Sequence, residues 1–184
     1  VWADDNKTLF YSKQDDETLR SDKIFKHSLG HQGDDTLVFN ETDETFGTSV
    51  YKSKSKKYII IVSYSTLTME FQTLRADDPN GEFKVFHPRS RGLDYSISHY
   101  GNDFYVLTNK DEATNFKLMK VAEGDTSADN WEEFIPHRED VLMEGLDIFK
   151  EYYVLSERKN GLNELKIVKW DGSDAYYLPF ETET

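Results

Sequence analysis

The sequence contains no cysteine, which excludes disulfide bonds and thiolate metal sites and suits a reducing compartment. Its longest apolar run, Tyr58–Val62, is far too short to span a bilayer. No signal peptide is present, but the chain opens at Val1 inside a predicted strand. We therefore expect that a natural N-terminal segment has been removed, so the missing signal says little about export.

Proline (four) and glycine (ten) are scarce, whereas aromatic residues make up 14% of the 184 residues. That bias favours β-strands, because aromatic side chains pack well on a pleated, half-buried surface. The formal net charge is -13, which argues against nucleic acids and anionic membranes as partners. We expect cationic partners and one domain of ordinary size rather than a large multilayer enzyme.

A unit of about 45 to 50 residues recurs four times. Each unit has an apolar strand that ends in a hydroxyl residue. These residues are Ser12, Ser63, Thr108 and Ser156, which are 51, 45 and 48 residues apart. A second strand follows and ends in a basic residue. These residues are His27, Arg75, Lys120 and Lys169, which are 48, 45 and 49 residues apart. A third strand follows each time, and a short one precedes each unit. The unit is therefore four antiparallel strands.

Such a sheet cannot bury both faces alone, and radial stacking of sheets solves this. The sequence thus predicts an all-β fold, a β-propeller fragment of about four blades, with approximate blade boundaries at 1–44, 45–92, 93–140 and 141–184. Residues 140–150 have a weak helical pattern, yet 146–149 fall where other repeats place an innermost strand, so we predict a strand there. Two packed sheets are the less favoured alternative.

Several stretches resemble the propeller of oligopeptidase B, a branch of the prolyl oligopeptidase family. They are Thr18–Arg20, Phe86–Arg89 leading to Tyr95–Tyr100, Asn115–Leu118, Trp131–Arg138, and Ser156–Arg158 with Gly161–Leu162. The resemblance implies a seven-bladed propeller beside an α/β-hydrolase domain with a Ser, Asp, His triad. It implies cleavage of short peptides after Arg or Lys, with the propeller restricting access to the active site, and a cytoplasmic location, a periplasmic one being left open. The chain would supply about four middle blades.

The residues themselves offer no catalytic machinery. A serine hydrolase needs a Gly-x-Ser-x-Gly elbow, and none occurs, so no catalytic residue is predicted and the hydrolase domain lies outside this chain. The five histidines lack metal-site spacing and are expected on the solvated surface, and no metal or cofactor is expected. Acidic pairs such as Asp34-Asp35 and Glu132-Glu133 leave a glycosidase as a remote alternative.

The loops carry the functional hypothesis, because a propeller presents its blade connections and its second-to-third-strand loops on one face. We expect that face to meet the hydrolase domain of the parent chain. The candidates for interdomain ion pairs or substrate contacts are Arg20, Arg89, Arg91, Arg138, Glu144, Glu157 and Arg158.

The net charge and the missing blades each predict a partner outside the parent chain. The acidic surface is expected to steer short basic peptides, the parent's substrates, toward the site. Four blades of seven leave two unpaired blade faces, so self-association through those faces is expected. The main rival is an independent protein-binding propeller, which the gene sequence downstream of Thr184 distinguishes.

Overall fold

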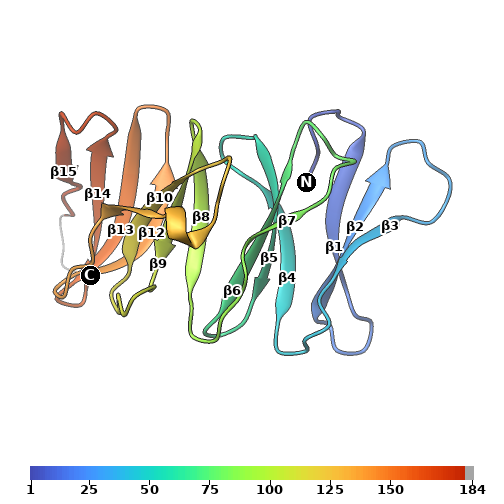
Figure 1. The fold of residues 1–184 in the computed structure, drawn as a ribbon, viewed down its shortest axis with the longest axis horizontal. Coiled ribbons are helices and arrows are strands. Elements are labelled where there is room, and N and C mark those ends of the chain that lie inside the picture. The colour runs from blue at the N-terminus through green and yellow to red at the C-terminus, as the bar shows by residue number, and fades with distance from the viewer. Residues whose placement is uncertain (181–184) are drawn as a thin grey trace. The chain divides into compact units, whose positions relative to one another are not determined.

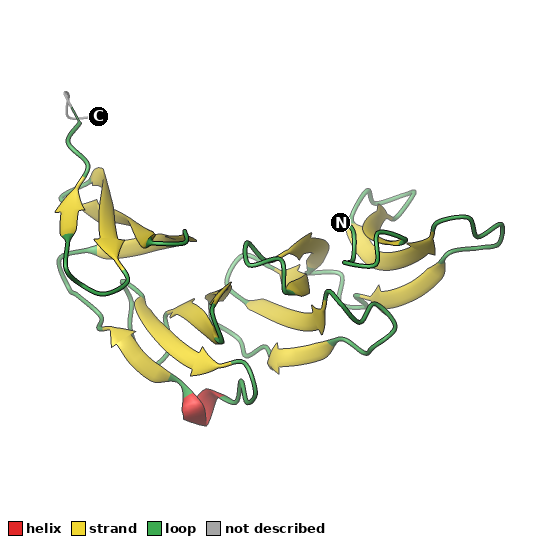
Figure 2. Ribbon diagram, turned by 90° about the horizontal axis from the view of Figure 1, so that it is seen from above, coloured by secondary structure: helices red, strands yellow, loops and turns green. Residues whose placement is uncertain are grey.

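A computed structural model describes residues 1–180 and shows an all-β protein. The one helical element among these residues is a short 3₁₀ turn, η1 (Ala128–Asn130), drawn in red in Figure 2. The chain divides into two compact units, Val1–Leu93 and Asp94–Thr184. Each unit contains two antiparallel sheets (Figure 1).

Unit 1 begins with a sheet in the order β1-β2-β3, made by Thr8–Gln14, Ser21–Ser28 and Thr36–Asn40. Its second sheet has the order β4-β5-β6-β7, made by Gly47–Lys52, Tyr58–Tyr64, Met69–Arg75 and Lys84–His87.

Unit 2 repeats the arrangement with two four-stranded sheets. The first comprises β8 (Tyr95–Tyr100), β9 (Asp103–Thr108), β10 (Lys117–Ala122) and β11 (Glu132–Ile135). The second comprises β12 (Leu142–Ile148), β13 (Tyr152–Lys159), β14 (Leu162–Lys169) and β15 (Ala175–Tyr177). Each of the four sheets lies inside one of the predicted blade ranges. The strand predicted at 146–149 is confirmed, because β12 covers most of it.

The apolar core of each unit lies between its two sheets. In unit 1, Phe10 of β1 packs with Ile59 and Leu74 of the second sheet. In unit 2 a larger cluster forms around Leu107, Leu118, Met143, Tyr153 and Leu155. Buried residues occupy both faces of the middle strand β5, whose centre is a run of β-branched residues, Ile59–Val62.

Aromatic rings complete the core of unit 2. The ring of Trp170 stacks on Tyr100 with centroids 4.3 Å apart and an interplanar angle of 6°, and it also contacts Tyr105 and Tyr153. Its indole N–H donates to the carbonyl of Phe149 at 2.9 Å. The polar edge of the ring is thus satisfied while its apolar body joins the two sheets.

A β-bulge recurs in the outermost strands of the first three sheets. Val38, Phe86 and Phe134 are each skipped in the pairing between the third and fourth strand positions. A bulge adds one unpaired residue and bends its strand. Phe86 is buried as a result, and Phe134 contacts the rings of Tyr105 and Tyr153.

The first sheet departs from the predicted four strands. Its innermost position is held by a single bridge between Trp2 and Leu9, with the N–H of Ala3 donating to the carbonyl of Thr8. The carboxylate of Asp5 accepts hydrogen bonds from the backbone of Lys7 and Thr8, which forms a turn immediately after this bridge.

Each sheet also has a face that the other sheet of its unit does not cover. In unit 1 the face of β1 and β2 carries Tyr11 stacked on Phe25, with centroids 5.8 Å apart. In unit 2 the corresponding face of β13 and β14 carries Val154 paired with Ile167. These residues are half-buried, in contrast to Phe10 and the alternate residues that pack into the cores.

Candidate functional site

The candidate site lies at the end of the sheets where the middle hairpin and the connection to the next sheet meet. We call this the loop end. In unit 1 it consists of residues 15–20, 41–46, 65–68 and 88–93, which lie at the lower edge of the sheets in Figure 1. In unit 2 it consists of residues 109–116, 136–141 and the tight turn at 160–161.

Arg20 holds the first connection of unit 1 in place. Its guanidinium donates to the backbone carbonyls of Glu41, Asp43 and Phe46 at 2.7 to 3.4 Å. Leu19, directly before it, has a φ of 58°, a left-handed conformation that is rare for a bulky residue. This local strain persists where surrounding contacts enforce it, and it places Arg20 over residues 41–46.

Arg89 ties the second connection of unit 1 to the first. Its guanidinium forms two hydrogen bonds with the carboxylate of Glu41, at 2.8 and 3.2 Å, and lies 4.1 Å from the ring centroid of Phe46. Its backbone N–H donates to Glu70 at 2.9 Å. The Glu41 side chain is only 2% exposed, so this bidentate pair holds a buried carboxylate.

The ionisation of this pair follows from its hydrogen bonds. Burial disfavours the charged form of Glu41, but the hydrogen bonds from Arg89 and from the Asp43 N–H outweigh it and hold the pKa of Glu41 below its ordinary value. The hydrogen bond with Glu41 in turn raises the pKa of Arg89. The two residues are therefore a stable ion pair at neutral pH.

Arg91 differs from its neighbour. It occupies a turn closed by a hydrogen bond from the Leu93 N–H to the Ser90 carbonyl, with Gly92 at a φ of 83°. The Gly92 N–H donates to the Thr68 hydroxyl at 3.2 Å, which joins this turn to the hairpin at 65–68. Among residues 1–180, the exposed guanidinium of Arg91 has no ion pair or hydrogen-bond partner.

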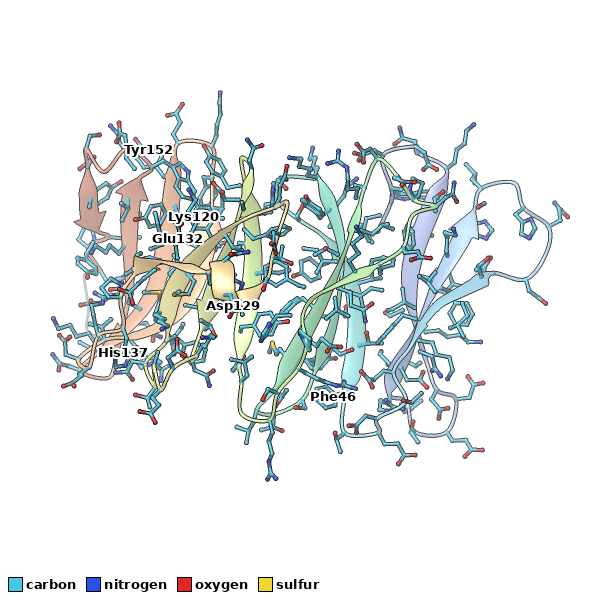
Figure 3. The ribbon with its side chains drawn as sticks, viewed as in Figure 1. Phe46, Lys120, Asp129, Glu132, His137 and Tyr152 are labelled. Carbon is cyan, nitrogen blue, oxygen red and sulfur yellow. The ribbon has the colours of Figure 1, made fainter. Side chains whose placement is uncertain are left out.

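A groove of about 560 Å³ opens at the loop end of unit 1. Figure 3 labels one of its lining residues, Phe46, at the lower edge of this unit. The lining residues are Thr45, Phe46, Ser65, Thr66, Leu67, Thr68, Arg89 and Arg91. Arg89 and Arg91, two of the sequence-predicted candidates, thus share one groove.

In unit 2, Arg138 donates a hydrogen bond to Glu157, whose side chain is fully buried. The hydroxyl of Tyr177 donates to the second oxygen of Glu157 at 3.0 Å. Burial lowers the pKa of Arg138, but the hydrogen bond with Glu157 outweighs this effect and raises it overall. The connection after β11 is thus fastened to the middle strand of the next sheet.

Asn115 performs in unit 2 the task that Arg20 performs in unit 1. Its side-chain amide donates to the backbone carbonyls of Arg138 at 3.0 Å and Glu139 at 2.8 Å. Phe116, the next residue, is again left-handed, with a φ of 62°. A hairpin side chain therefore clamps the following connection in both units.

The remaining two candidates form an exposed ion pair. Glu144 is the extra residue of a bulge in β12, and its carboxylate lies 2.7 Å from the guanidinium of Arg158. Six of the seven predicted candidates therefore have partners inside their own unit, and Arg91 has none among residues 1–180. Their predicted pairing with a hydrolase domain stays a prediction.

His99 and His27 differ from the expected solvated surface residues. The side chain of His99 is 0% exposed, and its Nε2 lies 3.1 Å from the carboxylate of Glu123. His27 Nδ1 lies 2.7 Å from Asp35, which also accepts a hydrogen bond from the Tyr11 hydroxyl at 2.6 Å. Asp35 therefore belongs to a hydrogen-bonded network with His27 and Tyr11, which lie 8 and 24 residues from it in the sequence.

A second hollow, of about 330 Å³, lies in unit 2 beside Lys120 and Glu132, which Figure 3 labels. The ammonium of Lys120 is 3.0 Å from Asp103, so its charge is already compensated. Within residues 1–180, no group of three or more His, Asp or Glu side chains is arranged to hold a metal ion. The same residues include no helix with the length and hydrophobicity of a membrane span.

Comparison with known proteins places this geometry in a family. Residues 1–181 match the family described as prolyl oligopeptidase, N-terminal β-propeller domain. The chain is 39% identical over 177 residues to dipeptidyl aminopeptidase BI of Pseudoxanthomonas mexicana, covering 96% of this chain and 24% of that protein. It is 29% identical over 168 residues to Protease 2 of Moraxella lacunata, covering 91% of this chain and 24% of that protein.

Solved structures give the same result. Oligopeptidase B from Leishmania major superimposes with a TM-score of 0.89 at 28% identity, over 99% of this chain and 27% of that one. Oligopeptidase B from Trypanosoma brucei, in a closed form with covalently bound antipain, gives 0.87 at 27% identity, over the same shares. The chain spans about a quarter of the length of the curated relatives it matches.

Proposed function

Given that this chain belongs to the prolyl oligopeptidase family, as part of its N-terminal β-propeller domain, we propose that it restricts access of peptides to the active site of a serine oligopeptidase that cleaves after Arg or Lys. The chain contributes blades and no catalytic residue. Its proposed role is to hold a rigid rim of loops against a hydrolase domain in the same parent chain.

The observation that carries this proposal is the fastening of the loop end. Arg20 and Arg89 fix the connections of unit 1, and Asn115 and Arg138 fix the connection of unit 2. A surface that admits short peptides and excludes folded proteins needs a rigid rim of loops. Side chains locked by buried hydrogen-bonded partners provide that rigidity.

The preference for basic substrates is supported by charge and by likeness. The net charge of -13 favours the approach of cationic peptides. The two oligopeptidase B structures and Protease 2 are among the proteins that this chain resembles.

The test uses the longer protein that contains this chain together with its peptidase domain. Short peptides with Arg, Lys or Pro before the scissile bond are compared by kcat/KM, as are the same sequences embedded in folded proteins. The proposal expects Arg and Lys peptides to be preferred and the embedded sequences to resist cleavage. Equal rates for Pro peptides, or cleavage of folded proteins, contradict it.

A dipeptidyl aminopeptidase is the second candidate, because the relative with that name is 39% identical over 96% of this chain. An enzyme that removes dipeptides from the amino end requires a free α-amine, whereas an oligopeptidase cleaves internally. Acetylating the substrate's amino end therefore separates the two. Loss of cleavage on acetylation supports the aminopeptidase, and retained cleavage supports the oligopeptidase.

Two further alternatives have direct tests. An independent protein-binding propeller requires that the gene downstream of Thr184 lack a hydrolase domain with its nucleophile elbow. A glycosidase requires activity from this chain alone. The cytoplasmic location is also a proposal, which fractionation of the source cells tests.

A further inference from the structure

The groove of unit 1 combines an apolar floor with one uncompensated cation. Phe46 and Leu67 supply the apolar part, and Leu67 is 66% exposed although it is a large hydrophobic residue. Arg89 and Arg91 supply the guanidinium groups. A hollow of about 560 Å³ is in the size range of small-ligand sites, which are typically about 300 to 1,000 Å³.

The two arginines have different roles in this groove. The charge of Arg89 is neutralised by the bidentate pair with Glu41, and its guanidinium carbon lies 4.1 Å from the ring centroid of Phe46. Arg89 therefore forms part of the wall. The guanidinium of Arg91, unpaired among the described residues, offers a planar fork of N–H donors that matches a carboxylate.

The backbone fixes the position of Arg91 without occupying its side chain. The turn that carries it is closed by the Leu93 to Ser90 hydrogen bond and is joined to Thr68 through Gly92. The neighbouring hydroxyls are engaged as well, since Thr68 accepts from Gly92 and Ser65 donates to the Thr68 carbonyl. Among the described residues, the side chain of Arg91 is thus the charged group of this groove left to meet a ligand.

Arg91 is unpaired among the described residues although the chain has 35 acidic and only 22 basic residues. We propose that this groove binds the carboxyl-terminal residue of a peptide. Arg91 pairs with the terminal α-carboxylate, and Phe46 and Leu67 contact an apolar terminal side chain. The inference rests on the proposed function, since it assigns the groove to the peptides that the propeller admits.

The terminal carboxylate is the occupant favoured by chemistry. Every linear peptide carries one whatever its sequence, so a single arginine serves many substrates. Only in a short peptide does this group lie a few residues from any internal bond. A site that binds it therefore distinguishes a short peptide from a loop of a folded protein, which a wholly apolar groove does not.

The experiment measures binding to this chain without any cleavage. A peptide with an apolar terminal residue, such as Ala-Ala-Phe, is titrated as the free acid and as the C-terminal amide, and the Arg side-chain N–H resonances are followed by NMR. The free acid is expected to shift the Arg91 resonance. The amide is expected to bind about 10-fold more weakly, because a charge-assisted pair is lost.

Variants assign the effect to the residue. Arg91→Gln is expected to weaken binding of the free acid about 10-fold and to leave the amide unchanged. Arg75→Gln is the matched control, because Arg75 is an exposed arginine of unit 1 that is paired with Asp77 outside the groove. Both positions are exposed, so both variants are expected to fold.

Three results overturn the inference. They are equal binding of acid and amide, no effect of Arg91→Gln, and equally strong binding of an amidated peptide with an internal aspartate. The last result assigns the groove to a side-chain carboxylate, such as one from a neighbouring domain. None of these results depends on cleavage specificity, so the groove and the proposed function fail separately.

Discussion

The guanidinium of Arg138 reaches from the connection after β11 to the buried carboxylate of Glu157 in the middle strand of the following sheet. Glu157 follows Tyr153 and Leu155 on the face of β13 that points into the core of unit 2, a position where an apolar residue is expected. A buried carboxylate is tolerated only when it is paired and hydrogen-bonded, and Arg138 and Tyr177 meet that requirement.

Replacing Arg138 by Met should therefore lower the free energy of unfolding by about 3 kcal/mol, because it leaves a buried charge uncompensated. Urea unfolding measures this. The double change Arg138→Met with Glu157→Met should recover most of the loss. Arg158→Met is the control, since its exposed pair with Glu144 should contribute less than about 1 kcal/mol. A single Arg138 variant as stable as the parent would contradict the assignment.

The pair of Arg89 and Glu41 predicts a pH dependence. The folded-state pKa of Glu41 lies below its ordinary value of 4.5. The ionised carboxylate therefore contributes stability that is complete above pH 4.5. That contribution is lost as the pH falls through the folded-state pKa. Glu41→Gln should thus cost about 2 kcal/mol at neutral pH, and the difference should shrink in acid.

Urea unfolding of both proteins at a series of pH values measures the difference. Asp16→Asn serves as the control, because Asp16 is exposed and makes no ion pair or hydrogen bond among the described residues. If the difference in unfolding free energy between the unchanged protein and Glu41→Gln stays constant down to strongly acidic pH, ionised Glu41 does not have this role.

The uncovered sheet faces predict self-association. Tyr11 and Phe25 in unit 1, and Val154 and Ile167 in unit 2, form apolar faces without a covering sheet in their own unit. Sedimentation velocity should show a sedimentation coefficient that rises with concentration. Phe25→Asp should reduce the rise, whereas Val85→Asp, on an exposed outer strand, should not. Strictly monomeric behaviour at high concentration would count against the prediction.

The acidic surface predicts that salt slows the parent enzyme. In the longer protein, kcat/KM for Arg or Lys peptides should fall as ionic strength rises, because screening weakens long-range attraction. An uncharged peptide of similar length is the control. A flat profile for the basic peptides would limit the role of the charge to solubility.

The repeats predicted the sheets well because each repeat encodes the same alternation of apolar strand, hydroxyl and turn. Within residues 1–180, the one departure is at the start, where a single bridge between Trp2 and Leu9 stands in place of the predicted innermost strand. Blade number and strand type follow from local patterns, and those patterns are visible in one sequence.

The pairing of the site residues could not be predicted in the same way. Arg89 and Glu41 are 48 residues apart and meet because consecutive blade connections lie side by side. A sequence signal did exist for the buried polar residues. Period-two alternation places His99 on the face of Tyr95 and Ile97, and Glu157 on the face of Tyr153 and Leu155. A charged residue in a buried series indicates a partner, without naming it.

The bulges in β3, β7 and β11 have a consequence for aggregation. The outermost strand of a blade has a free edge of unpaired backbone groups, which could template strands of other molecules. The extra residue in each bulge interrupts the regular spacing of those groups. Strand β15 pairs with β14 without such a shift, and its length of only three residues limits the edge that it offers instead.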